Sequence, residues 1–270
     1  MRLSLFLSAA ILTGGFTGSS CQQENPPLSS LLSKDLYEKS FPHHHLIYTY
    51  EALIKAAASY PSFAGEGDLT RRKRELAAFF AHIGHETTNG EESSPYSYGL
   101  YYTEEQACLD GHCTQYNTAG NSSYQPSPGK SYYGRGPLQL TYAYNYGLAG
   151  EEMDLPLLAK PESVSQDGVI AFKTALWFWM KSQKPKPSCH EVICGLWTPS
   201  AGDIRQGRKP GFGMTINIIN GGVECNTNTT EAKDERQDRI GFYKHMAALL
   251  QTTVEDDCDC ARMTPYTNGE

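Results

Sequence analysis

The chain has 270 residues, of which 39% are hydrophobic and 20% are charged. That is enough apolar material for one sizeable core. The formal net charge of −7 offers no electrostatic basis for binding nucleic acid or an anionic membrane, so we expect neither as a partner. We also expect the protein to be a monomer.

The N-terminal segment has the pattern of an export signal. Arg2 supplies a positive start, residues 3–12 form an apolar stretch too short to span a bilayer, and small residues 18–20 precede Cys21. We therefore predict a signal peptide over residues 1–20 and an extracellular protein. A lipidated Cys21 is the weaker alternative, because the residue three positions before it is not a large aliphatic one.

The rest of the chain shows no repeat and no further module. We predict a lead-in over residues 21–27, one domain over 28–262 and a tail over 263–270. Two glycosylation sequons, at Asn121 and Asn228, have meaning only in a eukaryotic secretory pathway.

Eight cysteines in an exported chain argue for disulfides. Two pairs of cysteines lie close enough in sequence to close local loops. A further cysteine could pair with either of two cysteines near the C-terminus, and this bond would tie a late loop to the C-terminal tail. The connectivity stays open. The candidates are Cys108 with Cys113, Cys189 with Cys194, and Cys225 with Cys258 or Cys260.

Apolar periodicity predicts helices over residues 73–86, 169–181 and 231–250, the first with Asp68 as its N-cap. The second is apolar nearly all round, so we expect Trp177 and Trp179 to be core residues rather than sugar platforms. Strand patterns are few and short. The balance predicts a mainly α fold.

Glu86 lies three residues after Ile83, on the edge of the apolar stripe of the first helix. Partial burial is expected to raise the pKa of this carboxyl, as a general acid requires, although a satisfied structural Glu fits the helix equally well. The next acidic pair lies in a following loop, where Glu105 is able to face Glu86 across a cleft, as glycoside hydrolysis requires. We expect Glu104 to belong to a solvated acidic turn.

Residues 132–146 combine tyrosines, amides and hydroxyls around two tight glycines, a mixture that suits sugars. The glycine spacing matches no nucleotide-binding pattern. His82 and His85 fail the zinc-protease motif because the fourth residue after His85 is Asn89, and residues 43–45 are expected to be an exposed loop of histidines. We predict neither metal nor cofactor.

Taken together, these segments resemble the plant-type chitinases of glycoside hydrolase family 19. The matching runs appear in family order across nearly the whole chain after the signal. They are Ala78-Phe79-Phe80-Ala81 with His85-Glu86-Thr87-Thr88, Gly134 to Thr141, Phe172 to Met180, Pro210-Gly211-Phe212-Gly213, Asn217 to Gly222, and Asp238 to Tyr243.

The resemblance implies a bilobal, lysozyme-like α+β fold, mainly helical, with a long substrate cleft and an inverting endochitinase. It implies Glu86 as general acid, Glu105 as general base and Thr141 as the residue that helps hold the attacking water. Chitin or chitooligosaccharides would be the substrate. The implied substrate-binding residues are Gln139, Tyr144, Asn145 and Asn217, and the implied pair that tunes the acid is Glu224 and Arg239.

The sequence departs from the family pattern at several points. Tyr101 replaces a Cys, so one family disulfide is missing, and the short segment 90–96 suggests a more open cleft. Cys113 matches a family position whose usual partner is absent, so Cys108 is its expected substitute, whereas Cys189 and Cys194 are extra. The alternatives are a glycosidase that cuts peptidoglycan and a non-catalytic chitin-binding defence protein.

Overall fold

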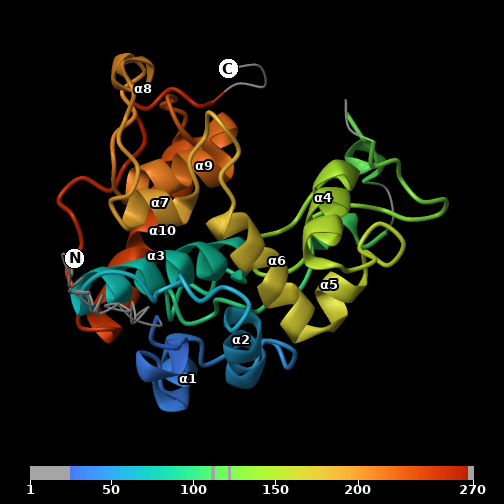
Figure 1. Ribbon diagram of the computed structural model, residues 1–270, viewed down its shortest axis with the longest axis horizontal. Coiled ribbons are helices and arrows are strands. Elements are labelled where there is room, and N and C mark those ends of the chain that lie inside the picture. The colour runs from blue at the N-terminus through green and yellow to red at the C-terminus, as the bar shows by residue number, and fades with distance from the viewer. Residues whose placement is uncertain (1–24, 111–112, 121–122, 267–270) are drawn as a thin grey trace, which may run out of the picture.

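The computed structural model describes residues 25–110, 113–120 and 123–266, and the chain there is mainly helical, as predicted (Figure 1). No helix in this part of the chain is both long and apolar enough to cross a membrane. The α-helices are α1 (Lys34–Ser40), α2 (Tyr50–Ala57), α3 (Leu69–Thr87), α4 (Ala143–Met153), α5 (Ser163–Gln166), α6 (Gly168–Met180), α7 (Cys189–Ile193), α8 (Ala201–Arg205), α9 (Phe212–Glu224) and α10 (Thr230–Leu249). Three single turns of 3₁₀-helix add η1 (Leu28–Ser30), η2 (Gln106–Cys108) and η3 (Thr114–Tyr116).

The three predicted helices correspond to α3, α6 and α10. The Asp68 carboxylate caps α3 by accepting a hydrogen bond from the Arg71 N–H at 2.8 Å, so this helix starts four residues earlier than its apolar stripe indicates. The start of α3 was the least accurate boundary, because Arg and Lys residues occupy its first turns and carry no apolar signal.

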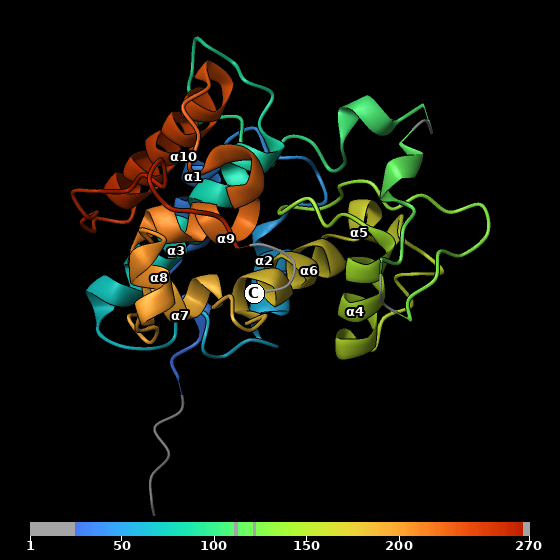
Figure 2. The ribbon, with the colours of Figure 1, turned by 90° about the horizontal axis from the view of Figure 1, so that it is seen from above.

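Two hydrophobic cores lie on either side of α6 (Figures 1 and 2). The larger core is formed by α1–α3, α7, α9 and α10, and the smaller by α4, α5 and the chain around Tyr132. Trp179 belongs to the first core and Trp177 to the second, and both side chains are buried. The apolar character of α6 on nearly every face therefore comes from its place between two cores.

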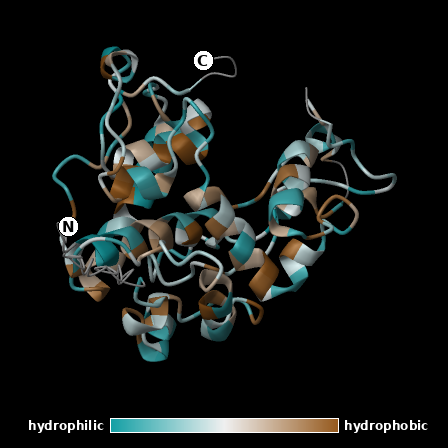
Figure 3. Cartoon of the chain, in the orientation of Figure 1, coloured by the Kyte–Doolittle hydropathy of each residue, from teal (hydrophilic) through white to brown (hydrophobic). Residues whose placement is uncertain are grey.

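Outside α6, most helices have one face in a core and one in water. Figure 3 shows hydrophobic and hydrophilic residues alternating along α1 and α2, as this arrangement requires. The most extensive helix contact joins α3 to α10, where a Cβ at Gly84 would come within 2.8 Å of the Phe242 ring. Glycine at this position lets the ring of α10 lie against the α3 backbone, just ahead of His85 and Glu86.

Extended structure in the described residues is limited to isolated bridges. All three are antiparallel, and two of them share Arg135, which pairs with Glu104 on one side and with Leu140 on the other. The Glu105 N–H also donates to the Gly134 carbonyl at 2.9 Å. These few contacts join the acidic loop to the glycine turn of residues 134–136.

Two disulfides are present in the described chain, Cys108–Cys113 and Cys225–Cys260. The expected loop between Cys189 and Cys194 is wrong, because both side chains are buried free thiols, as is Cys258. Cys189 opens α7 and Cys194 caps its end. Residues five apart on an α-helix have Cα atoms roughly 8–9 Å apart, beyond the reach of a disulfide.

Several predictions lie wholly or partly outside the described residues. These are the signal peptide over residues 1–20, Cys21 and most of the lead-in, the sequon that begins at Asn121, and the last four residues of the tail. Asn228 of the second sequon is exposed. The single domain over residues 28–262 stays a prediction.

Candidate active site

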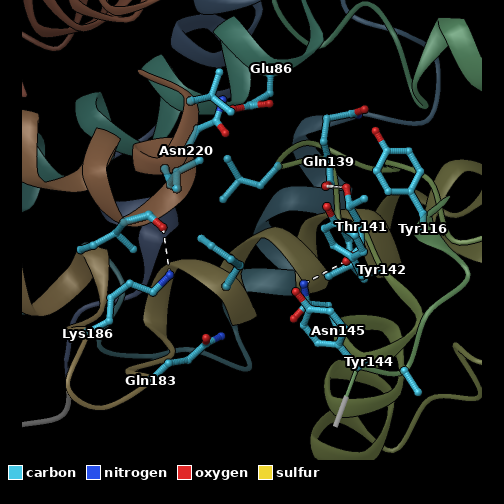
Figure 4. Close-up of a pocket in the computed structure, with 18 residues that line it drawn as sticks. Glu86, Tyr116, Gln139, Thr141, Tyr142, Tyr144, Asn145, Gln183, Lys186 and Asn220 are labelled. Carbon is cyan, nitrogen blue, oxygen red and sulfur yellow. Dashed lines mark hydrogen bonds between the residues drawn. The ribbon is translucent and has the colours of Figure 1, made fainter. Parts of the chain in front are cut away.

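A cleft with a volume of about 780 Å³ lies between the two cores. Glu86 at the end of α3 and Asn220 of α9 line one wall, and Thr141 and Asn145 line the opposite wall (Figure 4). Phe178 of α6 also lines the cleft. The cleft therefore forms where the helices of the larger core meet the start of α4.

Glu86 is held in place by one cation. Its side chain is 18% exposed, and its Oε1 accepts a hydrogen bond from the Arg239 Nη2 at 2.5 Å. The raised pKa expected for Glu86 from its place in the sequence stays a prediction.

Arg239 joins Glu86 to a second, fully buried carboxylate. Its Nε lies 3.0 and 3.1 Å from the two oxygens of Glu224, and its Nη2 lies 2.7 Å from one of them. Burial lowers and both carboxylates raise the pKa of Arg239, and the carboxylates prevail, so this residue remains a cation. One guanidinium thus fixes both the Glu86 and the Glu224 carboxylates, and Arg239 lies against Glu224, its expected partner behind the acid.

Buried His82 completes this network from the α3 side. Its Nδ1 lies 3.1 Å from the Arg239 Nη1, which can only donate, so Nδ1 accepts. The other nitrogen therefore carries the proton and donates to the Thr215 hydroxyl at 2.8 Å. Burial and the Arg239 charge lower the pKa of His82, consistent with a neutral ring.

His85, which precedes the predicted acid, is protonated, whereas His82 is neutral. Its Nδ1 lies 2.6 Å from Asp238 and its Nε2 lies 3.2 Å from Glu235, both on α10. Burial and Arg239 lower the pKa of His85, but the two carboxylates outweigh them and raise it above its usual value. The imidazolium ties the end of α3 to α10.

Glu105 sits beside the opposite wall. Its Oε1 accepts from the Tyr116 hydroxyl at 3.1 Å and its Oε2 accepts from the Gly134 N–H at 3.2 Å. Tyr116 itself lines the cleft. Gly134 has no room for a side chain, since a Cβ there would meet the Gln139 carboxamide at 2.7 Å. Both oxygens are anchored, and each keeps lone-pair capacity for a further donor.

Glu104 differs from the solvated turn predicted for it. Its side chain is 27% exposed and lies 3.4 Å from the Arg135 Nε, and it accepts from the Tyr133 hydroxyl at 3.1 Å. The neighbouring carboxylates thus point to different partners. Sequence periodicity missed this pairing because the cation lies 31 positions away in the glycine turn.

Thr141 faces the cleft from a turn with unusual backbone angles. Its hydroxyl donates to the Gln139 carbonyl at 2.6 Å. Gln139 and Tyr142 have φ values of 47° and 73°, a region that residues with side chains seldom adopt. Such conformations cluster at ligand-binding sites and are held by their surroundings, here by the bridge between Arg135 and Leu140.

The predicted sugar contacts divide into two groups. Gln139, Tyr144 and Asn145 line the cleft (Figure 4), and the Asn145 amide donates to the Thr141 carbonyl at 2.9 Å. Asn217 is only 3% exposed, donates to the Met263 carbonyl at 3.3 Å, and does not line the cleft. From the same helix the structure instead presents Asn220.

Comparison with known proteins agrees with this geometry. Residues 31–260 match the family model described as chitinase class I. The chain is 42% identical to a basic endochitinase of Vitis vinifera over 95% of this chain and 83% of that protein. It is 41% identical to an inactive chitinase-like protein of Hevea brasiliensis over 95% of this chain and 86% of that protein. Chitinase C from Streptomyces griseus superposes with a TM-score of 0.68 at 33% identity, covering 85% of this chain and 80% of that chain.

The chain belongs to the class I chitinase family. It is a glycosidase of that family, with its lysozyme-like, mainly helical fold. The resemblance read from the sequence motifs is confirmed.

Several polar cleft residues of this chitinase were not found from the sequence, among them Tyr142. Tyr116 anchors Glu105, Asn220 donates to Glu224 at 2.8 Å, and Gln183 and Lys186 line the cleft on the Glu86 side. Burial lowers the pKa of Lys186, whose amine donates to a carbonyl of α9. Among these residues, only Asn220 could have been inferred from the sequence, because it lies three positions after the predicted Asn217. Regular helical spacing would put both side chains on one side of α9, but a kink at Asn220 separates them.

Two groups of described residues in this chitinase lie close enough to hold a metal ion. In one, Glu105 stands beside Cys108 and Cys113, whose sulfurs are joined to each other and do not ligate. In the other, Glu75 and His190 are 2.7 Å apart, and Glu75 also accepts from the Trp179 indole at 3.0 Å. That group is accounted for as a buried, hydrogen-bonded ion pair.

Proposed function

We propose that this chitinase is a secreted endo-acting enzyme that hydrolyses β-1,4-linked N-acetylglucosamine polymers with inversion at the anomeric carbon. One observation carries the proposal. Glu86, held by Arg239, lines one wall of the cleft, and Glu105 accepts a hydrogen bond from Tyr116, which lines the opposite wall. Inverting glycosidases need two carboxyl groups roughly 6.5–9.5 Å apart, with room for a water between them.

Glu86 serves as the general acid. Its Oε1 is occupied by the Arg239 guanidinium, which leaves Oε2 to carry the proton that passes to the departing sugar oxygen. The same guanidinium stabilises the carboxylate that remains after the transfer. Glu224 stops Arg239 from moving toward the cleft as this charge develops.

Glu105 and Thr141 activate the water together. The Thr141 hydroxyl hydrogen is committed to the Gln139 carbonyl, so the hydroxyl oxygen accepts a hydrogen from the water. The other water hydrogen passes to Glu105. With both hydrogens directed, a lone pair of the water points at the anomeric carbon, on the side opposite the departing oxygen.

The opposite wall supplies contacts for the sugar rings. The rings of Tyr142 and Tyr144 stack with their centroids 5.4 Å apart, and Tyr116 meets Tyr142 edge-on at 5.3 Å. Such a row of tyrosines offers flat faces to pyranose rings, while Gln139 and Asn145 offer amides to hydroxyl and acetamide groups. Secretion is supported by the export-signal pattern and by two disulfides, which persist in oxidising compartments.

The decisive experiment is hydrolysis of a chitin hexamer by the wild type and by Glu86→Gln and Glu105→Gln variants. Proton transfer by a positioned side chain is worth roughly 10²- to 10⁴-fold in rate, so each variant should lose at least about 100-fold in kcat. Products resolved by NMR should appear first as the α-anomer. Initial β-anomer would exclude inversion, and substantial turnover by Glu86→Gln would remove it as the acid.

A non-catalytic role is the alternative to test, because one relative of 41% identity is named inactive, although relatives named endochitinases share 42% and 50% of their residues with this chain. Binding of the hexamer by purified wild type without any turnover would support that role. Clearing of bacterial cell walls without action on the hexamer would indicate a peptidoglycan substrate instead.

A further inference from the structure

A second hollow, of about 460 Å³, lies outside the catalytic cleft. One side is the loop between α1 and α2, and the other is the segment that continues into Glu105. Its lining residues are His43, His44, His45, Leu46, Tyr101, Tyr102, Thr103, Glu104, Gln106 and Leu109. None of these lines the catalytic cleft.

Exposed apolar side chains gather at this hollow. Leu46 is 77% exposed, Leu109 is 55% exposed and Tyr101 is 39% exposed. They are three of the seven large hydrophobic residues that are exposed in the described chain. Apolar groups gathered around one depression, with polar residues beside them, are typical of a binding surface.

The ring of Tyr101 is positioned by its neighbours. It lies edge-on to Tyr102 with centroids 5.0 Å apart and 6.0 Å from Tyr98, which in turn stacks on His43 at 4.1 Å with an interplanar angle of 17°. An aromatic ring held in this way binds a pyranose face with little loss of side-chain entropy.

The polar groups of the hollow favour a neutral ligand. Its one carboxylate, Glu104, is already paired with Arg135 and Tyr133, so no uncompensated acidic group faces the ligand. Gln106 donates to a backbone carbonyl at 2.8 Å and keeps its amide oxygen free, and the Thr103 hydroxyl is available within the described structure. Of the histidines in the lining, His44 is already paired with the Glu38 carboxylate at 3.1 Å, and the His43 ring stacks on Tyr98. Hydroxyl and acetamide groups match the remaining donors and acceptors.

The hollow is continuous with the catalytic segment. Glu104 lines the hollow, and the next residue, Glu105, is anchored by Tyr116 of the cleft wall. We propose that the hollow is an accessory sugar-binding site, in which Tyr101 stacks against a pyranose of a chitin chain that lies beyond the cleft. This inference rests on the proposed function.

The test compares exposed-residue variants, which leave the cores intact. In a Glu86→Gln background, which does not consume the ligand, Tyr101→Ala should weaken adsorption to insoluble chitin roughly three- to tenfold, the loss expected for one aromatic contact. Tyr101→Trp, which keeps a flat face, should adsorb as tightly as the parent. Leu196→Ala is the matched control, since Leu196 is 56% exposed and lies outside both hollows.

Turnover distinguishes this site from the cleft. With Glu86 restored, Tyr101→Ala should hydrolyse insoluble chitin more slowly and cleave a chitin tetramer at the wild-type rate. Equal adsorption by Tyr101→Ala and Leu196→Ala overturns the inference, as does a proportional loss on tetramer and polymer. A change in sedimentation without a change in adsorption would assign the hollow to contact between two copies and also overturn it. Failure of the wild type to cleave the tetramer contradicts the proposed function instead, and the adsorption comparison still decides the site.

Discussion

The hydroxyl of Thr141 has one defined direction in this cleft. Because its hydrogen is committed to the Gln139 carbonyl, only its lone pairs face the water that Glu105 would activate. The methyl group of the side chain has no part in this contact. A smaller residue that keeps the hydroxyl should therefore perform the same role.

We expect Thr141→Ala to lower kcat on a chitin hexamer roughly tenfold, the worth of about one hydrogen bond, while KM changes little. Thr141→Ser, which keeps the oxygen, should retain most of the activity. Steady-state kinetics of both variants measure the difference. If serine and alanine lose activity equally, packing of the methyl group rather than water binding accounts for the residue.

Among single residues, the sequence could place those on helices but not those in loops. Spacing placed Glu86 at the margin of a buried stripe because a helix converts sequence distance directly into direction. The choice between Glu104 and Glu105 depends on loops, where neighbouring side chains turn toward partners far away in the sequence, Arg135 and Tyr116. Periodicity holds no information about such partners.

Among the elements, the contact of α3 with α10 governs the site most directly. The two helices approach closely at Gly84 and are linked by His85 through Asp238 and Glu235. Glu86 and Arg239 are the next charged groups on each helix, so the same pairing of helices positions the acid and the cation that holds it.

This contact predicts how stability depends on pH. The folded state raises the pKa of His85, so the protonated ring contributes stability fully below the unfolded value near 6.5. The contribution disappears as pH rises through the folded pKa. His85→Gln should thus cost about 1–2 kcal/mol in acid, and less at alkaline pH. Urea unfolding of both proteins at pH 5 and pH 9 measures this, and a difference that stays constant across pH would contradict it.

Helices themselves were predictable where one face is buried. The stripes of α3 and α10 and the uniformly apolar α6 were visible in the sequence, and the structure contains all three. The short α7 and α8 were not predicted. Each begins with a serine capping box, a local hydrogen-bond pattern that fixes a single turn without an apolar stripe.

On the scale of the whole molecule, the disulfide between Cys225 and Cys260 encloses α10. The two cysteines are 35 positions apart. Replacing both with serine should lower the free energy of unfolding by roughly 3–4 kcal/mol, because a loop of this length gains that much entropy in the unfolded chain. Urea denaturation measures the loss. Cys258→Ser is the control, since Cys258 is a free thiol that donates to the Glu255 carbonyl. An equal loss in the control would show that the cost comes from packing.

The arrangement of the lobes was available from the sequence only through resemblance to a family. Nothing in the periodicity of α6 says that its two tryptophans enter different cores, because a helix buried in one core has the same composition. The sharing of α6 became visible only when the distant segments around Tyr132 and Phe79 were placed on either side of it.

That sharing has a consequence for folding. Trp177 and Trp179 of the same helix fill different cores. If either core unfolds, α6 loses its packing on that side and the other core loses a rigid neighbour. The two lobes are thus coupled in a single cooperative unit, and a population with only one lobe folded is penalised by the exposed face of α6. A cleft lined from both sides then exists only in the complete native state, and any partly unfolded form lacks one of the two carboxylates in position.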